Sequence, residues 1–366
     1  MSDFLIIGGG VIGMMTALQL ADAGRQVILV ERNACGQEAS WAGGGIVSPL
    51  YPWRYQPPIS RLSRWSEGAY PSLALRLLED TGIDPEYRQR GLLYLQVDDE
   101  AQALAWAHET GKPLERRDGR FVYAKEPNLV AGVEEALWMP TLGSIRNPRL
   151  IQALRARLLS MPGVTLREQC EVTGFEQRGA RITGVTTPHG VVHGDEIIVC
   201  GGAWASLLLT ELGIQLPVKP IKGQMLAYQA PKGLVERVVL MNGRYVIPRA
   251  DGLLLVGSTL EDTGFEKSLS AVAEESLSQS AQAMVPALKD LPVAHHWAGL
   301  RPGSPDGMPF IGKVPQWDNL YVNAGHFRNG LVLAPASTHL LVDQLLGREP
   351  IIDPAPYQLT PERLGG

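Results

Sequence analysis

Cysteine is scarce in this 366-residue sequence, and the few cysteines present do not pair. Cys35, Cys170 and Cys200 are odd in number, and none of them forms a C-x-x-C motif. Disulfide-stabilised secreted domains and zinc ribbons need paired cysteines. The adjacent His295 and His296 would point to opposite faces of a strand and make a poor metal pair. The sequence therefore predicts no metal site and a cytoplasmic location.

The sequence also lacks long apolar runs and an excess of basic residues. No stretch has the roughly 18 uninterrupted apolar residues typical of a membrane span, and the first apolar run lacks the flanks of a signal peptide. The formal net charge is −5 and the pI about 5.9, whereas nucleic-acid-binding domains usually carry a clustered basic face. We therefore expect neither a membrane nor a nucleic acid as a partner, and the composition favours small-molecule chemistry.

Glycine is plentiful, with 40 residues, and it follows an informative pattern near the start of the chain. Residues 4–7 form a short apolar run that predicts a buried strand, and residues 14–23 carry apolar side chains at helical spacing. Residues 27–30 form a second apolar run. A helix between two buried strands predicts a βαβ unit.

Three glycines join the first predicted strand to the helix. Gly8, Gly10 and Gly13 have the G-x-G-x-x-G spacing, which allows a tight turn, close approach of a pyrophosphate and close packing of the helix on the strand. Glu31 follows at about the 20-residue distance where an acidic side chain accepts hydrogen bonds from a ribose. The glycine motif alone is also compatible with a surface turn, but in this context it predicts a dinucleotide site. The spacing does not distinguish NAD from FAD.

Beyond this unit, hydrophobic periodicity predicts alternating blocks of helix and strand. The further predicted helices cover residues 59–81 (interrupted or kinked near Pro71), 101–109, 150–160, 270–288, a segment after Gly202 and a segment from Leu331 onward. The further predicted strands cover residues 91–97, 121–123, 164–166, 171–176, 196–200, 222–228, 238–240, 244–247, 253–256 and 320–323. We expect an α/β plus α+β fold, in which a Rossmann-type domain is interleaved with a domain built on an antiparallel sheet.

Several motifs recur in a fixed order over nearly the whole chain. They are GGGVIG with Glu31, ASWAGGGI, CGGAW, RYVIPR, AGLRPGSPDGMPFIG and GHFRNGL. In these segments the sequence resembles the D-amino acid oxidase family of FAD-dependent amine oxidoreductases, and most closely its thiamine-pathway branch. The resemblance implies an FAD-binding domain over about 1–80, 145–215 and 300–366, and a substrate-binding domain over about 81–144 and 216–299.

The resemblance favours FAD over NAD and implies that FAD is held without a covalent bond. Related sarcosine oxidases attach their flavin through a cysteine, and residues 306–312 contain none. The residues implied to bind FAD are Gly8, Gly10, Val11, Ile12, Gly13, Glu31, Arg32, Ala39, Ser40, Gly44, Gly45, Ile46, Val172, Gly201, His326, Phe327, Arg328, Asn329, Gly330, Leu331 and Val332.

The resemblance also implies that Tyr245, Arg301 and Arg328 are the catalytic and substrate-binding residues. On pattern alone, an arginine beside a proline is usually a surface residue, and a strand tyrosine is usually structural. An amino acid bound over a flavin nevertheless needs its carboxylate neutralised, and a guanidinium fork does this with two parallel bonds. A tyrosine hydroxyl can add a third, orienting contact.

The implied activity is oxidation of glycine and other small amines, such as sarcosine or small D-amino acids. Dioxygen is the electron acceptor, and the products are an oxo acid, ammonia or an amine, and hydrogen peroxide. The resemblance also suggests a homotetramer, and leaves open whether the role is thiamine biosynthesis or amine catabolism. Two alternatives are a D-amino acid dehydrogenase that passes electrons to a quinone, and an FAD domain that modifies tRNA.

Overall fold

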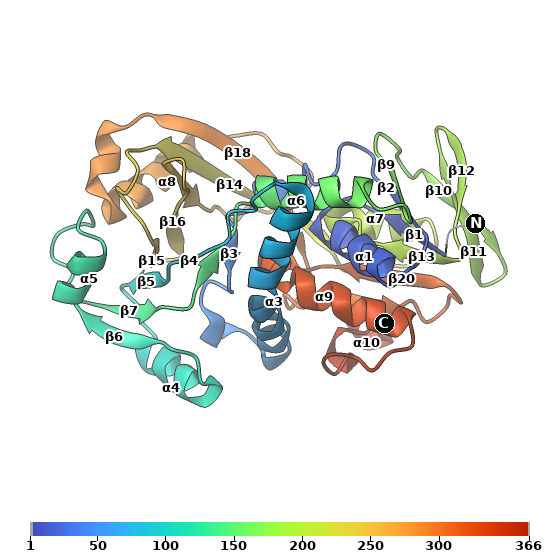
Figure 1. Cartoon of the computed structure of the whole chain (residues 1–366), viewed down its shortest axis with the longest axis horizontal. Helices are drawn as coiled ribbons and strands as arrows, with labels where there is room; N and C mark the ends of the chain where they lie inside the picture. The colour runs from blue at the N-terminus through green and yellow to red at the C-terminus, as the bar shows by residue number, and fades with distance from the viewer. Residues whose placement is uncertain (1–2, 365–366) are drawn as a thin grey trace.

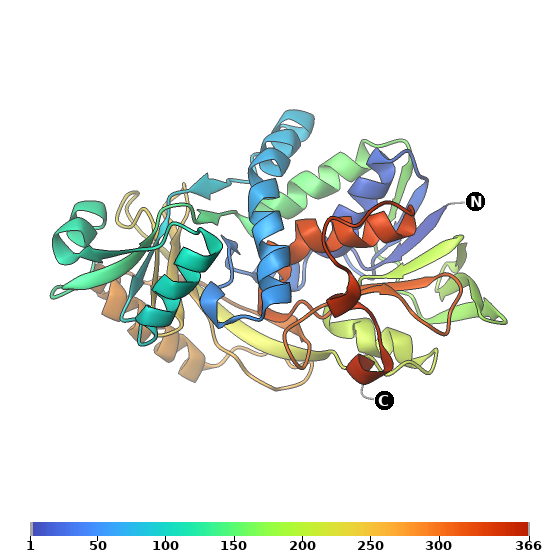
Figure 2. The same cartoon turned by 90° about the horizontal axis from the view of Figure 1, so that it is seen from below.

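The computed structural model describes residues 3–364 and contains two large sheets that lie side by side. Helix α3 (Pro57–Thr81) stands between the two halves, and α6 (Asn147–Leu159) extends from it over the half that contains α1, as Figures 1 and 2 both show. No helix within residues 3–364 combines the length and apolar character that a membrane span would need.

One half is built on a six-stranded sheet that contains the predicted βαβ unit. Its strands are, in spatial order, β19 (Phe310–Lys313), β20 (Leu320–Ala324), β13 (Glu196–Val199), β1 (Phe4–Ile7), β2 (Val27–Val30) and β9 (Val164–Arg167). All neighbouring pairs are parallel except β19 with β20. The carboxyl ends of the parallel strands, which come from distant parts of the chain, therefore lie at one edge of the sheet. Helix α1 (Val11–Asp22) begins at this edge, directly after β1.

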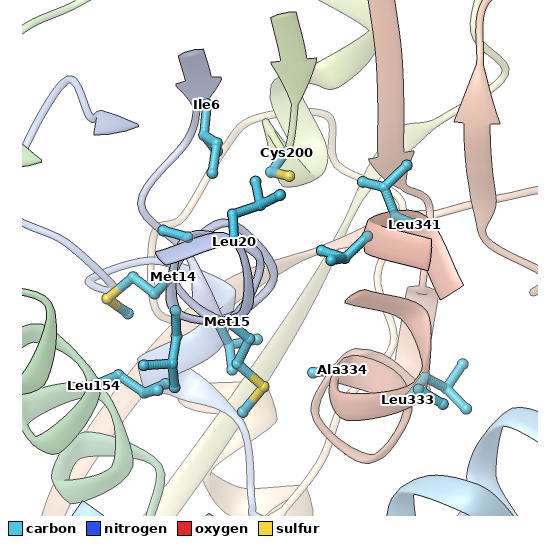
Figure 3. Packing of buried hydrophobic residues seen from close by; sticks show 14 of the residues in the cluster. Ile6, Met14, Met15, Leu20, Leu154, Cys200, Leu333, Ala334 and Leu341 are labelled. Atoms are coloured by element: carbon cyan, nitrogen blue, oxygen red, sulfur yellow. The ribbon is translucent and has the colours of Figure 1, made fainter. Parts of the chain in front are cut away.

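The six-stranded sheet is buried on both faces, which explains the continuous apolar runs of its strands. Ile6 packs with α1, α3, α6 and α9 (Gly330–Leu345), whereas Leu5 packs on the opposite face. Figure 3 shows Leu20 from α1 on the side that faces Leu341 from α9, and Met14 from α1 on the opposite side, toward Leu154 from α6. Each fully buried side chain of this kind contributes about 1.5–3 kcal/mol.

The opposite face is covered by a smaller antiparallel sheet and a short helix. These are β10 (Gly174–Arg178), β11 (Arg181–Thr187), β12 (Gly190–His193) and α7 (Ala205–Thr210), which follows the 3-10 turn η2 (Gly202–Trp204). The strand predicted over 171–176 begins later in the structure, and β11 and β12 were not predicted.

The other half is built on an eight-stranded sheet. Its strands are, in spatial order, β18 (Val293–Gly303), β14 (Lys219–Gln229), β17 (Leu253–Gly257), β16 (Arg244–Pro248), β15 (Val238–Met241), β5 (Leu92–Leu95), β7 (Glu135–Met139) and β6 (Glu115–Asp118). Only β15 and β5 pair in parallel, so the predicted antiparallel sheet is present with one exception. Helix α8 (Ala271–Met284) packs on one face and α4 (Glu100–Thr110) on the other.

Short elements link the two halves and the chain ends. Strands β3 (Ile46–Val47), β8 (Gly143–Ser144) and β4 (Arg88–Gln89) form a small antiparallel sheet. The others are α2 (Ala39–Ala42), η1 (Pro52–Arg54), α5 (Gly119–Lys125), η3 (Pro286–Asp290), η4 (Phe327–Asn329), η5 (Ala355–Tyr357) and α10 (Pro361–Leu364).

Two local predictions were wrong, and one alternative of a third was wrong. The segment Phe121 to Tyr123 lies in α5, not in a strand, because Asp118 caps the helix by accepting a hydrogen bond from the Phe121 N–H at 2.9 Å. Helix α8 ends at Met284, because Pro286 cannot continue a helix. Helix α3 runs through Pro71 without the predicted interruption, while the alternative of a kink near Pro71 stays a prediction.

Candidate active site

The turn between β1 and α1 has no room for side chains. Gly8 has a φ of +109°, and a Cβ there would lie 2.5 Å from the Cys200 carbonyl oxygen. A Cβ on Gly13 would lie 1.9 Å from the Gly8 carbonyl oxygen. Helix α1 therefore begins directly beside β1, and its first N–H groups, which lack partners within the helix, face the sheet edge.

Two side chains hold this turn in place. The Val11 N–H donates to Ser40 Oγ at 2.9 Å, and the Gly9 N–H donates to Glu31 Oε2 at 2.7 Å. The second Glu31 oxygen accepts from the Asn33 N–H at 3.0 Å. Glu31 thus shapes the turn itself, whereas its contact with a ribose stays a prediction.

Two cavities meet at this turn. The central cavity, with a volume of 180 Å³, lies between the two large sheets, and the outer cavity, 310 Å³, lies beside β2, β10 and α7. Both are lined by Gly10, Ala39, Ser40, Cys200 and Gly202. Together they make one elongated space with a helix N-terminus at its middle, where a pyrophosphate would bind.

Almost all predicted site residues line this space. The central cavity is lined by Gly10, Val11, Ile12, Ala39, Ser40, Gly44, Gly45, Ile46, Tyr245, Arg301, His326, Phe327, Arg328, Asn329, Gly330, Leu331 and Val332. The outer cavity is lined by Gly8, Gly10, Glu31, Arg32, Ala39, Ser40, Val172 and Gly201. Gly13 lines neither, because it packs against Gly8 instead.

The glycine loop before β3, which lines the central cavity, is held by a half-buried arginine that the sequence did not predict. Arg249 donates to the carbonyl oxygens of Gly44, at 2.7 Å, and Ile145, at 3.0 Å. Burial lowers the pKa of Arg249 to about 10, so it remains charged at neutral pH. The only hint in the sequence is its place in the RYVIPR motif.

Asn147 adds an unsatisfied acceptor to the same wall. Its Nδ2 donates to the Ser40 carbonyl oxygen at 2.9 Å, while its buried Oδ1 has no hydrogen-bond partner among the described residues 3–364. Such an atom is costly unless a ligand donates to it. A flavin ring carries an N–H donor, so the residues present fit a flavin in the central cavity. No sequence motif pointed to Asn147.

The cavity segment from His326 to Asn329 is held by a buried polar network. Ser337 Oγ donates to Asn323 Oδ1 at 2.6 Å, which uses its only hydrogen. The His326 Nε2 atom, 2.7 Å from Ser337 Oγ, must therefore be the donor in that pair. Burial lowers the pKa of His326 to about 3, so the ring is neutral at physiological pH.

The substrate end of the central cavity is formed by side chains from β16 and β18. Arg301 donates to Ser258 Oγ at 2.7 Å and to the Thr259 carbonyl oxygen at 3.2 Å. Burial lowers the pKa of Arg301 below its usual value. Within residues 3–364 no carboxylate forms an ion pair with it, so its charge is available to an anionic ligand.

Tyr245 reaches the same place and is almost fully buried. Its hydroxyl has one weak partner, the Met225 Sδ atom at 3.9 Å. A Cβ on Gly44 would lie 3.3 Å from this hydroxyl, so the glycine loop and the tyrosine face each other. Arg328 is exposed and also lines the cavity. The three predicted residues thus converge on one end of the cavity.

A parallel sheet with this phosphate turn, opposite an antiparallel sheet that carries arginine and tyrosine, is the arrangement expected of a flavin-dependent oxidoreductase. Comparison with known families agrees with this assignment: the model of the FAD dependent oxidoreductase family (DAO) matches residues 3–344. The chain therefore belongs to this family. The predictions of an enzyme and of FAD as its cofactor are confirmed.

Similar proteins cover nearly the whole chain. A glycine oxidase from Pseudomonas aeruginosa is 52% identical, with 96% of this chain and 97% of that protein covered. A glycine oxidase from Pseudomonas putida is 51% identical, with 99% of both covered. The crystal structure of glycine oxidase from Geobacillus kaustophilus has a TM-score of 0.91 at 30% identity, with 98% of both chains covered. The predicted fold class is therefore confirmed.

Proposed function

We propose that the protein oxidises glycine and other small primary or secondary amines with dioxygen. The observation that carries this proposal is the pair of Arg301 and Tyr245, which line the central cavity, where no Asp or Glu of residues 3–364 is part of the lining. A guanidinium and a hydroxyl suit the carboxylate of an amino acid. The names of the relatives support glycine as the amine.

The protein's own residues bind and orient the substrate. Arg301 takes its carboxylate, Tyr245 adds a hydrogen bond, and Arg328 adds a second positive charge at the cavity opening. FAD, when bound, accepts a hydride from the substrate α-carbon and passes the electrons to dioxygen. Positioning of that carbon is then the main contribution of the protein. For glycine, water and dioxygen are consumed, and glyoxylate, ammonia and hydrogen peroxide are formed.

FAD would be held without a covalent bond. Cys200 is the one cysteine that lines both cavities, but burial raises the pKa of its thiol to about 12. A thiol of this kind is not nucleophilic at neutral pH. Denaturation with acid should therefore release all the flavin into the supernatant. Flavin that stays with the precipitate would contradict this part of the proposal.

Three further expectations rest on the family resemblance. We propose a homotetramer located in the cytoplasm, with the FAD-binding domain over about 1–80, 145–215 and 300–366. The substrate-binding domain would cover about 81–144 and 216–299. Light scattering of the purified protein tests the first expectation directly, since a mass of one or two chains would overturn it.

The decisive experiment is a visible spectrum recorded without oxygen, before and after glycine is added. We expect a flavin band that bleaches with glycine and returns when air is admitted, with one peroxide formed per amine consumed. A flavin band that bleaches but returns only with an added quinone would favour the dehydrogenase alternative. A band that no small amine bleaches would overturn the proposed function while leaving the family intact.

A further inference from the structure

The segment that joins β17 to α8, residues 258–270, contains no helix and no strand. Both of its ends are fixed on β14. Near its start the Gln224 N–H donates to Thr259 Oγ1 at 2.8 Å, and at its end the Ser270 N–H donates to Gln224 Oε1 at 3.0 Å. Between these contacts, residues 262–269 are exposed. The segment, called the strap below, is therefore a loop with fixed ends and an exposed middle part.

Phe265 and Lys267, in the middle of the strap, contact the half of the protein that contains the six-stranded sheet. The Phe265 and Trp204 ring centroids are 5.4 Å apart, and Trp204 belongs to η2. The Lys267 Nζ atom lies 3.0 Å from Oε2 of Glu38, which directly precedes α2. Glu38 and Trp204 both line the outer cavity. The strap therefore contacts two residues of the cavity wall, although none of residues 258–270 lines the outer cavity itself.

Arg32 joins these two wall residues to each other. Its guanidinium carbon lies 3.9 Å from the centroid of the Trp204 ring, and its Nη2 atom lies 3.3 Å from Glu38 Oε1. Arg32 also lines the outer cavity and is a predicted FAD-binding residue. Arg32, Glu38 and Trp204 thus form one connected wall group, which the strap contacts at two points. Because the flavin fits the central cavity and the pyrophosphate fits the turn, the outer cavity is left for the adenosine part of FAD.

We propose that Phe265 and Lys267 are positioning residues that hold the wall group against the adenosine part of FAD, so that release of FAD requires the strap to move. This inference rests on FAD as the cofactor and on the outer cavity as the place of its adenosine part, not on which amine is oxidised. Phe265 is 40% exposed, and the side chains of Lys267 and Glu38 are 45% and 26% exposed. Exposed ion pairs are weak, so the strap can open while both large sheets stay folded.

The test measures how fast the holoenzyme releases FAD after dilution. Rapid gel filtration at set times separates bound from free FAD, and the flavin-to-protein ratio gives the release rate. Phe265→Ala should release FAD about twofold to tenfold faster than the wild type, because the contact between two rings is lost. Lys267→Gln should release FAD about twofold to fivefold faster. Lys267→Arg keeps the charge that pairs with Glu38 and should release FAD at nearly the wild-type rate.

Salt distinguishes the two contacts of the strap. At about 1 M salt the Debye length is only about 3 Å, so an exposed ion pair is screened, whereas a contact between rings is not. The release rate of Lys267→Gln divided by that of the wild type should therefore fall toward one at high salt. The same ratio for Phe265→Ala should stay above one. A general loss of stability would not separate the two variants in this way.

Two matched controls remove similar groups outside the strap. Val272 is exposed on α8 and Lys289 is exposed in η3, so Val272→Ala and Lys289→Gln should release FAD at the wild-type rate. Wild-type release rates in both Phe265→Ala and Lys267→Gln would overturn the inference. Faster release in variants that also unfold at a clearly lower temperature in excess FAD would indicate general destabilisation and would overturn it too. Oxidation of glycine is measured separately, so either result leaves the proposed function standing.

Discussion

The two cavities share a nucleotide end at the β1–α1 turn, and the central cavity has a substrate end, and these two ends are built in different ways. At the nucleotide end, Gly8 and Gly10 let the backbone come close to a ligand, and the helix N-terminus supplies the polar groups. At the substrate end, Arg301 from β18 and Tyr245 from β16 line the cavity with long side chains. The nucleotide end depends on glycines, which have no side chain. The substrate end depends on side chains that come from separate strands. Added bulk should therefore damage the first end, and truncation the second.

The largest effect is expected from bulk at the nucleotide end. Gly10 has a φ of −71°, which any residue can adopt, but a Cβ there would lie 3.2 Å from Ser40 Oγ. Gly10→Val should place its methyl groups where the two cavities meet and abolish FAD retention while the fold persists. The flavin-to-protein ratio and the far-ultraviolet circular dichroism of the purified variant measure these two properties.

The matched control is Gly68→Val. Gly68 is exposed on α3, and a Cβ there would meet no atom within 4 Å. This variant should bind FAD as the wild type does. A yellow Gly10→Val protein with the normal FAD content would show that the backbone at this turn does not limit the site.

The next effect is expected from truncation at the substrate end. Arg301→Ala should lower kcat/KM for glycine by roughly 2–5 kcal/mol, mainly through KM, because the substrate carboxylate would be buried without its partner. FAD content should not change. Arg301→Lys should recover little, because an ammonium cannot reproduce the two parallel bonds of a guanidinium fork. An unchanged KM in Arg301→Ala would remove this residue from the substrate site.

The contrast between the two ends also explains how much could be predicted from the sequence. The signals at the nucleotide end are local: apolar runs, glycine spacing and Glu31 all lie within one βαβ unit. Arginine and tyrosine at the substrate end have no such local signal, and only the motifs shared with the family singled out Tyr245, Arg301 and Arg328. Whether these residues act as expected stays a prediction, although the structure places them on one cavity.

The residues that the sequence missed share a physical reason. Asn147 and Arg249 act through contacts with backbone carbonyls of distant segments, which no periodicity reveals. One of the strands that were missed, β6, is polar and exposed: it has the sequence ERRD, with all four residues exposed. Such a strand has no apolar alternation to detect. Local propensity also misled at Phe121, where the cap on α5 decides the structure.

A smaller effect concerns His326, which lines the central cavity. Its pKa is about 3 in the folded protein and near 6.5 in an unfolded chain. Between these two pH values the unfolded state binds more protons than the folded state. The contribution of His326 to the free energy of unfolding is therefore fully present above about pH 6.5 and is lost as the pH falls toward 3. The free energy of unfolding should therefore change with pH by up to about 1.4 kcal/mol per pH unit.

Urea unfolding of the holoenzyme at pH 7, 6 and 5 measures this slope. His326→Gln cannot titrate and should flatten it, even if the variant is less stable throughout. The control is His295→Gln, since His295 is exposed on β18 and should leave the slope unchanged. Equal slopes in the wild type and in His326→Gln would mean that other groups cause the acid sensitivity.

The smallest effect is expected from Tyr245→Phe. The variant keeps the ring that packs against the glycine loop and loses only the hydroxyl, whose one protein partner is a sulfur at 3.9 Å. Because that partner is weak, the folded protein should lose little stability. The substrate carboxylate would lose one hydrogen bond, which lowers kcat/KM for glycine by about 0.5–1.5 kcal/mol. A sharp fall in thermal stability with an unchanged kcat/KM would contradict this prediction. Tyr245 would then be a structural residue of the eight-stranded sheet, and the substrate end would depend on arginine alone.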